Sequence, residues 1–334
     1  METQLLSTDT EEGFNEALEL AVAQLRQGEV VAVPTETVYG LAANALEASS
    51  VEKIFTGKDR PAQNPIIVHV SSESMARDCV AQWPESAGKL ANAFWPGPLT
   101  LVLPKADTIP GNVVAGGATV GVRWPSHPFI QQLITACSFP LAAPSANLSN
   151  HISPTSAEHV KSQMEGRIPL IIDGGPAQVG IESTVVDLSG DSVRVLRPGM
   201  ISMEAIEAVL SDAVITAGKD VGVLKSPGQL ERHYAPNARL LVLNWKDEED
   251  LENQISYSRT PHDRVHVIAH THVVGGTRFG RVSMLPREAQ AYAQVLYGEL
   301  HQCDQEGAEL ICVEAPPDDP EWVAINDRLS RAGG

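Results

Sequence analysis

Residues 30–45, VVAVPTETVYGLAANA, join a short apolar run to a polar loop. The β-branched run VVAV predicts a buried strand, which Pro34 ends. Threonine, glutamate and tyrosine side chains and a glycine follow at once. Loops at strand ends are where binding and catalytic groups concentrate, so we expect this loop to contact a ligand. The alternative is a turn that only caps a following helix.

Similar apolar runs recur through the first two-thirds of the chain. They predict strands at 66–70, 99–103, 120–124, 140–143, 170–173, 184–188 and 193–196. Helical spacing of apolar residues predicts helices at 12–27, 48–56, 85–94, 127–136, 156–164 and 202–210. Capping boxes that start at Thr8 and Thr155 would begin two of these helices. Because the spacers between strands are uneven, we predict an α/β fold with a mixed, twisted open sheet rather than a regular doubly wound one.

The pattern weakens at 211–237, where two prolines, a glycine and a histidine-tyrosine pair predict a linker. A second series of alternating elements follows, with strands predicted at 239–245, 264–270, 278–285 and 309–315 and helices at 247–255, 287–307 and 322–332. This series predicts a smaller Rossmann-like α/β domain, although no G-x-G-x-x-G follows any strand. The predicted domains are therefore 1–215 and 238–334, with a linker or lid at 216–237.

The composition narrows the class of protein. The formal net charge is −18 and both halves are acidic, so RNA binding is not expected to be the main function. No run approaches the roughly 18 apolar residues of a membrane span, and the acidic start METQLLSTDTEE is unlike a signal peptide, so we expect a cytoplasmic protein. The four cysteines form no C-x-x-C pair and are expected to be buried. They are Cys79, Cys137, Cys303 and Cys312.

Cationic and polar side chains follow several of the predicted strands and helices. Lys58, Arg60 and Asn64 lie in a Pro-rich loop and could bind phosphate oxygens, or form a solvated charged turn. His69 alternates with two valines and alone is more often a packed histidine than a ligand. Arg123, if buried, needs either a substrate carboxylate or an internal acid as its partner.

Two later loops could bind an anion. Residues 141–160 offer small side chains, the alternating polar pair Ser145 and Asn147, and Ser153 before a helix. Residues 173–188 are glycine-rich, but Ile181-Glu182 stands where a Walker A motif has Lys-Ser/Thr, so no P-loop is present. The histidines at 266, 270 and 272 have a spacing like that of metal ligands. We prefer the interpretation that they lie on an exposed face of a strand.

The chain contains an ordered set of motifs: PTETVYGL (34–41), K-x-R-P-x-x-N-P (58–65), GVRWPSHP (121–128), PSAN (144–147), and IESTVVD (181–187) followed by RPG (197–199). These motifs closely resemble those of the YrdC-like threonylcarbamoyl-AMP synthase family. SPGQLERHYAP (226–236) and the C-terminal α/β series resemble its long, two-domain form. The resemblance covers essentially the whole chain.

The resemblance implies a reaction in which L-threonine, bicarbonate or CO2, and ATP give L-threonylcarbamoyl-AMP and diphosphate with Mg2+. A separate transferase would then modify adenosine 37 of tRNA, so stable tRNA binding by this chain is not expected. The implied threonine pocket is formed by Thr37, His69, Arg123, Ala143 and Ser183. The implied ATP site is formed by Lys58, Arg60, Asn64, Thr119, Ser145, Asn147, Ser153, Arg197 and Tyr234.

Lys58 and Arg60 would be the catalytic cations, and no residue is assigned as a ligand of Mg2+. The threonine-derived carbamate would attack the α-phosphorus, which needs positioning and charge neutralisation rather than a general base. Segment 226–236 is expected to close over the site as a lid. Asp59 and Gln229 depart from the family pattern, and the Asp59 side chain should point away from phosphate.

Two alternatives stay open. YrdC-like domains also occur in hydrogenase-maturation proteins that adenylate carbamate itself, but this chain lacks their acylphosphatase-like and zinc-finger segments. A non-enzymatic RNA-binding protein is disfavoured by the acidic balance and by the intact set of polar motifs.

Overall fold

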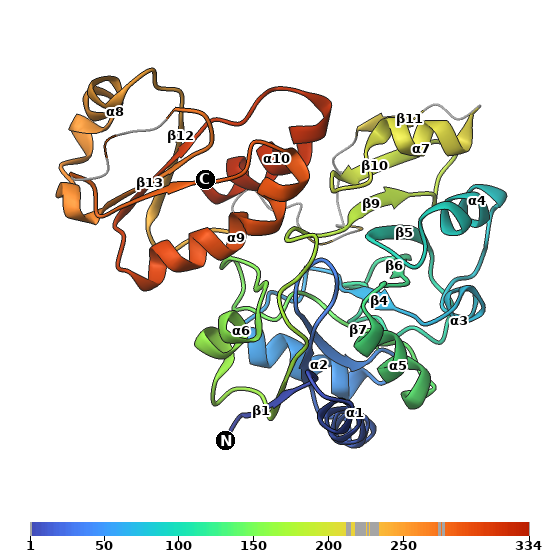
Figure 1. The fold of residues 1–334 in the computed structure, drawn as a ribbon. Helices are drawn as coiled ribbons and strands as arrows, with labels where there is room; N and C mark the ends of the chain where they lie inside the picture. Colours follow the sequence, from blue (N-terminus) through green and yellow to red (C-terminus); the bar gives the residue numbers. More distant parts are fainter. Residues whose placement is uncertain are drawn as a thin grey trace. The chain divides into compact units, whose positions relative to one another are not determined.

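The computed structural model describes residues 2–211, 215–217, 225, 227, 234–272, 275 and 278–333 (Figure 1). The chain forms two compact units. The first comprises Met1–Ser149 and Ser153–Gln229, and the second comprises Asn150–Ile152 and Leu230–Gly334. Helices pack on a sheet in each unit, so the predicted α/β class is confirmed.

The strands of the first unit form a single mixed sheet, as predicted. They are β1 (Gln4–Ser7), β2 (Val31–Val33), β3 (Gly40–Asn44), β4 (Ile67–His69), β5 (Leu99–Pro104), β6 (Thr119–Arg123), β7 (Leu141–Ala142), β8 (Leu170–Asp173), β9 (Thr184–Asp187), β10 (Val193–Arg197) and β11 (Ile215–Ala217). In the described part of the chain their order is β1-β8-β2-β3-β7-β4-β6-β5-β9-β10-β11. Strand β6, for example, is parallel to β4 and antiparallel to β5. Strand β11 shows that this sheet continues past residue 215.

The helices of the first unit begin close to their predicted positions. They are α1 (Glu11–Arg26), α2 (Ala48–Lys58), α3 (Glu73–Asp78), α4 (Glu85–Phe94), α5 (Pro128–Cys137), α6 (Ala157–Met164) and α7 (Met203–Leu210). The two predicted capping boxes are wrong. Thr10 and Ser156, rather than Thr8 and Thr155, cap α1 and α6 by accepting from the amides three residues on, at 3.0 and 3.3 Å. These hydroxyls immediately precede the first helical turn, which is where a side chain reaches the free amides.

The two faces of this sheet are covered differently. Helices α2, α3, α4, α6 and α7 pack on one face and form the larger core. Helices α1 and α5 lie side by side on the other face, where they cover β2, β3, β7 and β8 (Figure 1). Because side chains alternate along a strand, β4 and β6 place His69 and Arg123 on this second face. In β10 a register shift between Val195 and Arg197 interrupts the alternation, and Arg197 reaches the Ser183 hydroxyl on the same face. That polar part of the second face carries the candidate site.

The second unit contains a small parallel sheet, as the Rossmann-like prediction requires. Its elements are β12 (Arg239–Leu243), α8 (Glu248–Ile255), β13 (Val265–Ala269), β14 (Arg281–Met284), α9 (Ala289–Gln305), β15 (Leu310–Glu314) and α10 (Val323–Gly333), with short 3-10 turns at Ser256–Ser258, His262–Arg264 and Pro320–Trp322. All strand pairs are parallel, in the order β12-β15-β13-β14. Segment Asn150–Ile152 joins this unit through a bridge between His151 and Ala235.

The interpretation of the three histidines as an exposed strand face is wrong. His266 and His270 are buried, and only His272 is exposed. His270 and His272 follow the end of β13, where the buried carboxylate of Glu314 accepts from both of their amides. Across the described residues, no group of three or more His, Cys, Asp or Glu side chains is arranged to hold a metal.

Burial also decides the role of the cysteines. All four are free and buried, as predicted. Burial raises the pKa of the Cys79, Cys303 and Cys312 thiols to about 12 and that of Cys137 to about 11. A nucleophilic cysteine needs the opposite shift, so these thiols act as apolar core groups. Within the described residues, no helix is long and apolar enough to cross a membrane.

Candidate active site

The loop at residues 34–39, after β2, is the centre of the candidate site. The Thr35 hydroxyl donates to the carbonyl of Val38 at 2.6 Å and accepts from the amides of Thr37 and Val38 at 3.2 Å. Amides of the Gly-rich loop donate to the carbonyls of Glu36 and Thr37, at 2.7 and 3.1 Å. The main chain is thereby fixed, and the side chains of Glu36 and Thr37 are held in buried positions.

The Arg123 guanidinium is buried against this loop. Its Nη1 donates to the Thr37 hydroxyl at 2.9 Å, and its Nε donates to the Gly97 carbonyl at 3.3 Å. Its Nη2 lies 2.7 Å from Oε1 of Glu36. A buried arginine needs such a partner, because an isolated buried charge is strongly destabilising. Of the two partners that the sequence allowed, the structure shows the internal acid.

His69 lies beside Arg123, its in-register neighbour on β4. Val68 and Val70 point into the larger core on the opposite face, as the alternation predicts. Burial, and then the nearby Arg123 charge, lowers the pKa of His69 from 6.5 to about 3. The ring is therefore neutral near pH 7, and its buried Nδ1 has no hydrogen-bond partner in the part of the chain described. Such a nitrogen can bind a ligand group without adding charge.

A second buried cation, Arg197, lies three strands further along the sheet, on β10. Arg197 donates from Nε to the Ser183 carbonyl at 3.0 Å and from Nη2 to the Ser183 hydroxyl at 3.1 Å. That hydroxyl is also 2.8 Å from the hydroxyl of Thr100. The Nη1 of Arg197 donates to the Pro227 carbonyl at 3.4 Å, which holds this part of the predicted linker at the end of β10. A buried guanidinium bonded to neutral oxygens is suited to an anionic ligand.

Lys58 is the last residue of α2 and clamps a neighbouring loop. It is 1% exposed, and its Nζ donates to the carbonyl of Ser145 at 2.5 Å and to that of Asn147. Burial, and then the charge of Arg60, holds the pKa of Lys58 well below its usual value. The partners that the described residues give this group are carbonyl and amide oxygens, and a bound anion would stabilise its charged form.

The Pro-rich loop after α2 is organised by its arginine. Arg60 donates from Nε to the Asn64 carbonyl at 3.2 Å and from Nη2 to the Pro65 carbonyl at 2.8 Å. Asn64 is buried, and its Oδ1 has no partner among the described atoms. Asp59 pairs with Arg167 at 2.9 Å and its side chain is 69% exposed, so it lies at the surface. Its φ of 51° explains why glycine suits this position.

Loop 141–160 supplies further buried polar groups. The Asn147 side-chain amide donates to the Leu148 carbonyl at 2.8 Å. The Ser153 hydroxyl donates to Oε1 of Glu182 at 2.6 Å, and both residues are buried. Backbone bonds at 2.8 Å join this loop to Tyr39, one from the Tyr39 amide and one to its carbonyl. The loops predicted separately from the sequence are thus connected through residues 34–39.

Two predicted residues lie on the sheet itself. Thr119 is half-buried at the start of β6 and, by alternation, shares the face of Arg123. Ala143 follows β7, and its amide donates to the Ile67 carbonyl at 3.1 Å. The Ala143 amide is therefore engaged in a main-chain hydrogen bond.

Tyr234 belongs to the second unit, unlike the other predicted site residues. It has a φ of 63° and is 1% exposed. Its ring stacks on Tyr297 with centroids 6.0 Å apart, and the Arg328 guanidinium lies 5.3 Å over it. The predicted lid spans 226–236, of which residues 226 and 228–233, including Gln229, lie outside the described residues.

Three contributors were not singled out from the sequence. Glu36, Thr100 and Glu182 are buried and contact predicted site residues. Glu36 had a usable signal, since a carboxylate between two threonines directly after a buried strand is unusual unless it has a partner. Thr100 and Glu182 are recognisable only once the strand order is known.

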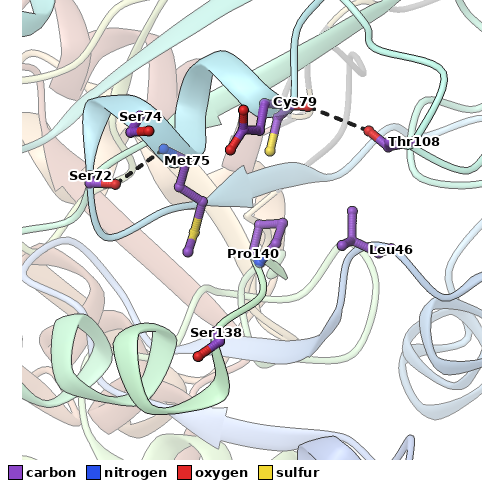
Figure 2. A pocket seen from close by; sticks show the side chains of 9 residues that line it. Leu46, Ser72, Ser74, Met75, Cys79, Thr108, Ser138 and Pro140 are labelled. Atoms are coloured by element: carbon purple, nitrogen blue, oxygen red, sulfur yellow. Dashed lines mark hydrogen bonds between the residues drawn. The ribbon is translucent and has the colours of Figure 1, made fainter.

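A separate cavity of about 370 Å3 lies elsewhere in the first unit (Figure 2). Its lining includes Ser72, Met75, Cys79, Thr108 and Pro140, and none of the predicted site residues. The Thr108 hydroxyl donates to the main-chain carbonyl of Asp78 at 3.4 Å, which ties its two walls together. It offers no cationic side chain, so anion chemistry belongs to the polar sheet face instead.

The site combines buried cations, a neutral histidine and strand-end loops on a mixed sheet, and the sequence has no P-loop. These features define an α/β enzyme that acts on anionic substrates. A family model described as Telomere recombination matches residues 23–199, and one described as the C-terminal domain of threonylcarbamoyl-AMP synthase matches 201–334. The chain belongs to the threonylcarbamoyl-AMP synthase family, in the two-domain form that its sequence resembles.

Relatives of known sequence and structure match along nearly the full length. The threonylcarbamoyl-AMP synthase of Pyrococcus abyssi is 40% identical over 323 residues, covering 95% of this chain and 94% of the relative. That of Bacillus subtilis is 42% identical over 319 residues, covering 94% and 92%. The crystal structure of P. abyssi Sua5 complexed with L-threonine matches with a TM-score of 0.89 at 38% identity, covering 100% of this chain and 98% of that one.

Proposed function

We propose that this chain converts L-threonine, bicarbonate or CO2, and ATP into L-threonylcarbamoyl-AMP and diphosphate. The observation that carries the proposal is the polar sheet face, where the buried Arg123 and Arg197 flank a hydroxyl pair and the neutral His69 lies beside Arg123. Glu36 offsets the charge of Arg123, whereas the hydrogen bonds that Arg197 forms within the described residues go to neutral oxygens, and such a buried cation is costly to maintain without an anionic ligand. Both the amino acid and the nucleotide supply such anions.

The threonine pocket lies around Arg123. Its guanidinium binds the substrate carboxylate, because a planar fork of donors matches two carboxylate oxygens. Thr37 and Ser183 lie within reach of the two arginines and offer hydroxyl groups to the substrate. The neutral His69 adds a hydrogen bond without a charge, and Ala143 adds a backbone group.

The ATP side uses the remaining cations. Lys58 and Arg60 hold the loops that carry Ser145, Asn147 and Asn64, and Arg197 lies on the polar sheet face beside Ser183. The residues proposed to complete this side are Thr119, Ser153 and Tyr234. Their task is to hold the α-phosphorus in line with the carbamate oxygen and to offset the charge of the leaving diphosphate. Because the carbamate is already anionic, no general base is required for this step.

Mg2+ is proposed to enter with ATP. Among the described residues, no group of three or more His, Cys, Asp or Glu side chains is arranged to hold a metal. Mg2+ commonly keeps several waters and takes further ligands from substrate phosphates. Bound there, Mg2+ would neutralise phosphate charge, while the side chains of this chain orient the substrates.

The product is proposed to leave for a separate transferase that modifies adenosine 37 of tRNA. The net charge of −18 supports the assignment of the tRNA step to a separate protein. An acidic enzyme repels a polyanion but can hold a small adenylate in a locally cationic pocket. We place the reaction in the cytoplasm, where ATP and tRNA are both available.

The test is diphosphate release from ATP by the purified full chain. We expect release that needs both L-threonine and bicarbonate. Release that needs carbamoyl phosphate instead would point to the carbamate-adenylating alternative, and release with neither addition would refute the proposal. Arg60→Glu should abolish release, whereas Arg167→Glu, at an arginine paired with the exposed Asp59, is the matched control and should retain it.

A further inference from the structure

Glu36 is a buried carboxylate whose hydrogen-bonding capacity is unfilled. It is 3% exposed, and neither Oε1 nor Oε2 has a hydrogen-bond partner within the described part of the chain. Its contact with Nη2 of Arg123 is a charge pair at 2.7 Å, and Nη2 likewise forms no hydrogen bond. The charge of Glu36 is therefore compensated, whereas its lone pairs are not.

The neighbouring protein groups do not supply the missing donors. The Thr37 hydroxyl accepts from Nη1 of Arg123 and lies 2.9 Å from the Thr35 hydroxyl. The Thr35 hydroxyl in turn donates to the Val38 carbonyl. A carboxylate can accept about four hydrogen bonds, and buried polar groups in native proteins are almost always satisfied. The missing donor is therefore expected from a bound molecule.

The charges of Arg123 and Glu36 indicate which charged groups the bound molecule carries. Arg123 and Glu36 present a cation and an anion side by side in a buried site. An α-amino acid is a zwitterion with the complementary pair, and its ammonium group brings three N–H donors. A hydroxy acid, or an amino acid whose nitrogen is already acylated, brings no such cation.

We propose that Glu36 is a substrate-binding residue that receives the α-ammonium group of L-threonine while Arg123 receives its carboxylate. This inference rests on the proposed function, because it assigns one more residue to the same threonine pocket. It makes Glu36 the group by which the enzyme selects a free α-amino acid. A charge-assisted hydrogen bond of this kind corresponds to roughly a 10- to 100-fold effect on affinity.

The competing role for Glu36 is only to hold Arg123 in place. The two roles differ in what they predict for a ligand without the amino group. If Glu36 binds the ammonium, its removal weakens L-threonine alone. If Glu36 only orients Arg123, its removal weakens every ligand that presents a carboxylate to that arginine.

The experiment is calorimetric titration of the full chain, with a nonhydrolysable ATP analogue present, using L-threonine and 2,3-dihydroxybutanoate, which has a hydroxyl in place of the ammonium. We expect Glu36→Gln to lower the affinity for L-threonine about 10- to 100-fold and to leave that for 2,3-dihydroxybutanoate unchanged or higher. Glu36→Asp, which retains the charge, should recover part of the loss. Unchanged affinity for the ATP analogue shows that each variant is folded.

Equal weakening of both ligands would overturn the inference, as would unchanged binding of L-threonine to Glu36→Gln or no binding to the wild-type chain. The proposed function fails separately. A wild-type chain that shows the expected ligand discrimination but releases no diphosphate with L-threonine and bicarbonate refutes the reaction and leaves the assignment of Glu36 standing.

Discussion

Removing Arg123 should destabilise the first unit chiefly through the carboxylate that it leaves behind. In Arg123→Met the side chain keeps its length, but Glu36, 3% exposed, stays buried without a counter-charge. Breaking a buried pair from one side costs about 3–5 kcal/mol. The lost hydrogen bonds to Thr37 and Gly97 add roughly 1 kcal/mol each. The total is a large part of the stability of an ordinary domain.

A double-mutant cycle isolates the charge pair. Combining Arg123→Met with Glu36→Gln removes both charges, so the double variant should be more stable than the sum of the single losses by about 2–3 kcal/mol. The assay is urea unfolding of the full chain, with the first unit followed by hydrogen exchange in β6. L-threonine binding should not return in the double variant. Additive losses would refute the reasoning, because they would mean that the 2.7 Å contact carries no coupling.

Three further predictions concern single positions in the same unit. His69 is neutral when folded and binds a proton when unfolded between pH 6.5 and about 3, so stability falls with pH in that window. From pH 7 to 5 the free energy of unfolding of the wild-type chain should fall by about 2 kcal/mol more than that of His69→Gln. An equal fall in both proteins, measured by urea unfolding at the two pH values, would contradict this. Asp59→Gly should raise the free energy of unfolding by about 0.5–1 kcal/mol without changing activity, because φ is 51°; a lower value would show that the exposed pair with Arg167 matters more. Arg60→Glu should lose all diphosphate release while keeping the wild-type circular dichroism spectrum, and an active variant would remove Arg60 from the site.

The periodic part of the fold was predictable from the sequence. The eight strands and six helices expected in the first two-thirds are all present. Strand β3 was not expected, because Gly40–Asn44 is rich in glycine and alanine and has low β-propensity. Helix α3 has six residues, too few to show a helical period. Both are fixed by their neighbours in the sheet and the core rather than by local preference.

The site divides in a similar way. Motif order placed the polar residues on strand-end loops, and the structure joins those loops through residues 34–39. Which side chains meet could not be predicted, because partners such as Thr37 and Arg123 are 86 residues apart in sequence. Thr37 lies between β2 and β3 and Arg123 ends β6, so their contact depends on where the strand order places these strands, and strand order is a property of the whole sheet. For the same reason the sequence could not predict that Lys58 donates to backbone carbonyls; it suggested phosphate as the partner.

The central claim is that this chain joins threonine, bicarbonate and ATP into one adenylate. The most direct measurement is mass spectrometry of the nucleotides formed by the purified chain from ATP, L-threonine and 13C-labelled bicarbonate. The account predicts threonylcarbamoyl-AMP that carries the 13C label, formed only when L-threonine is present and absent with Arg60→Glu. An adenylate without the label, or labelled product without threonine, would contradict the account.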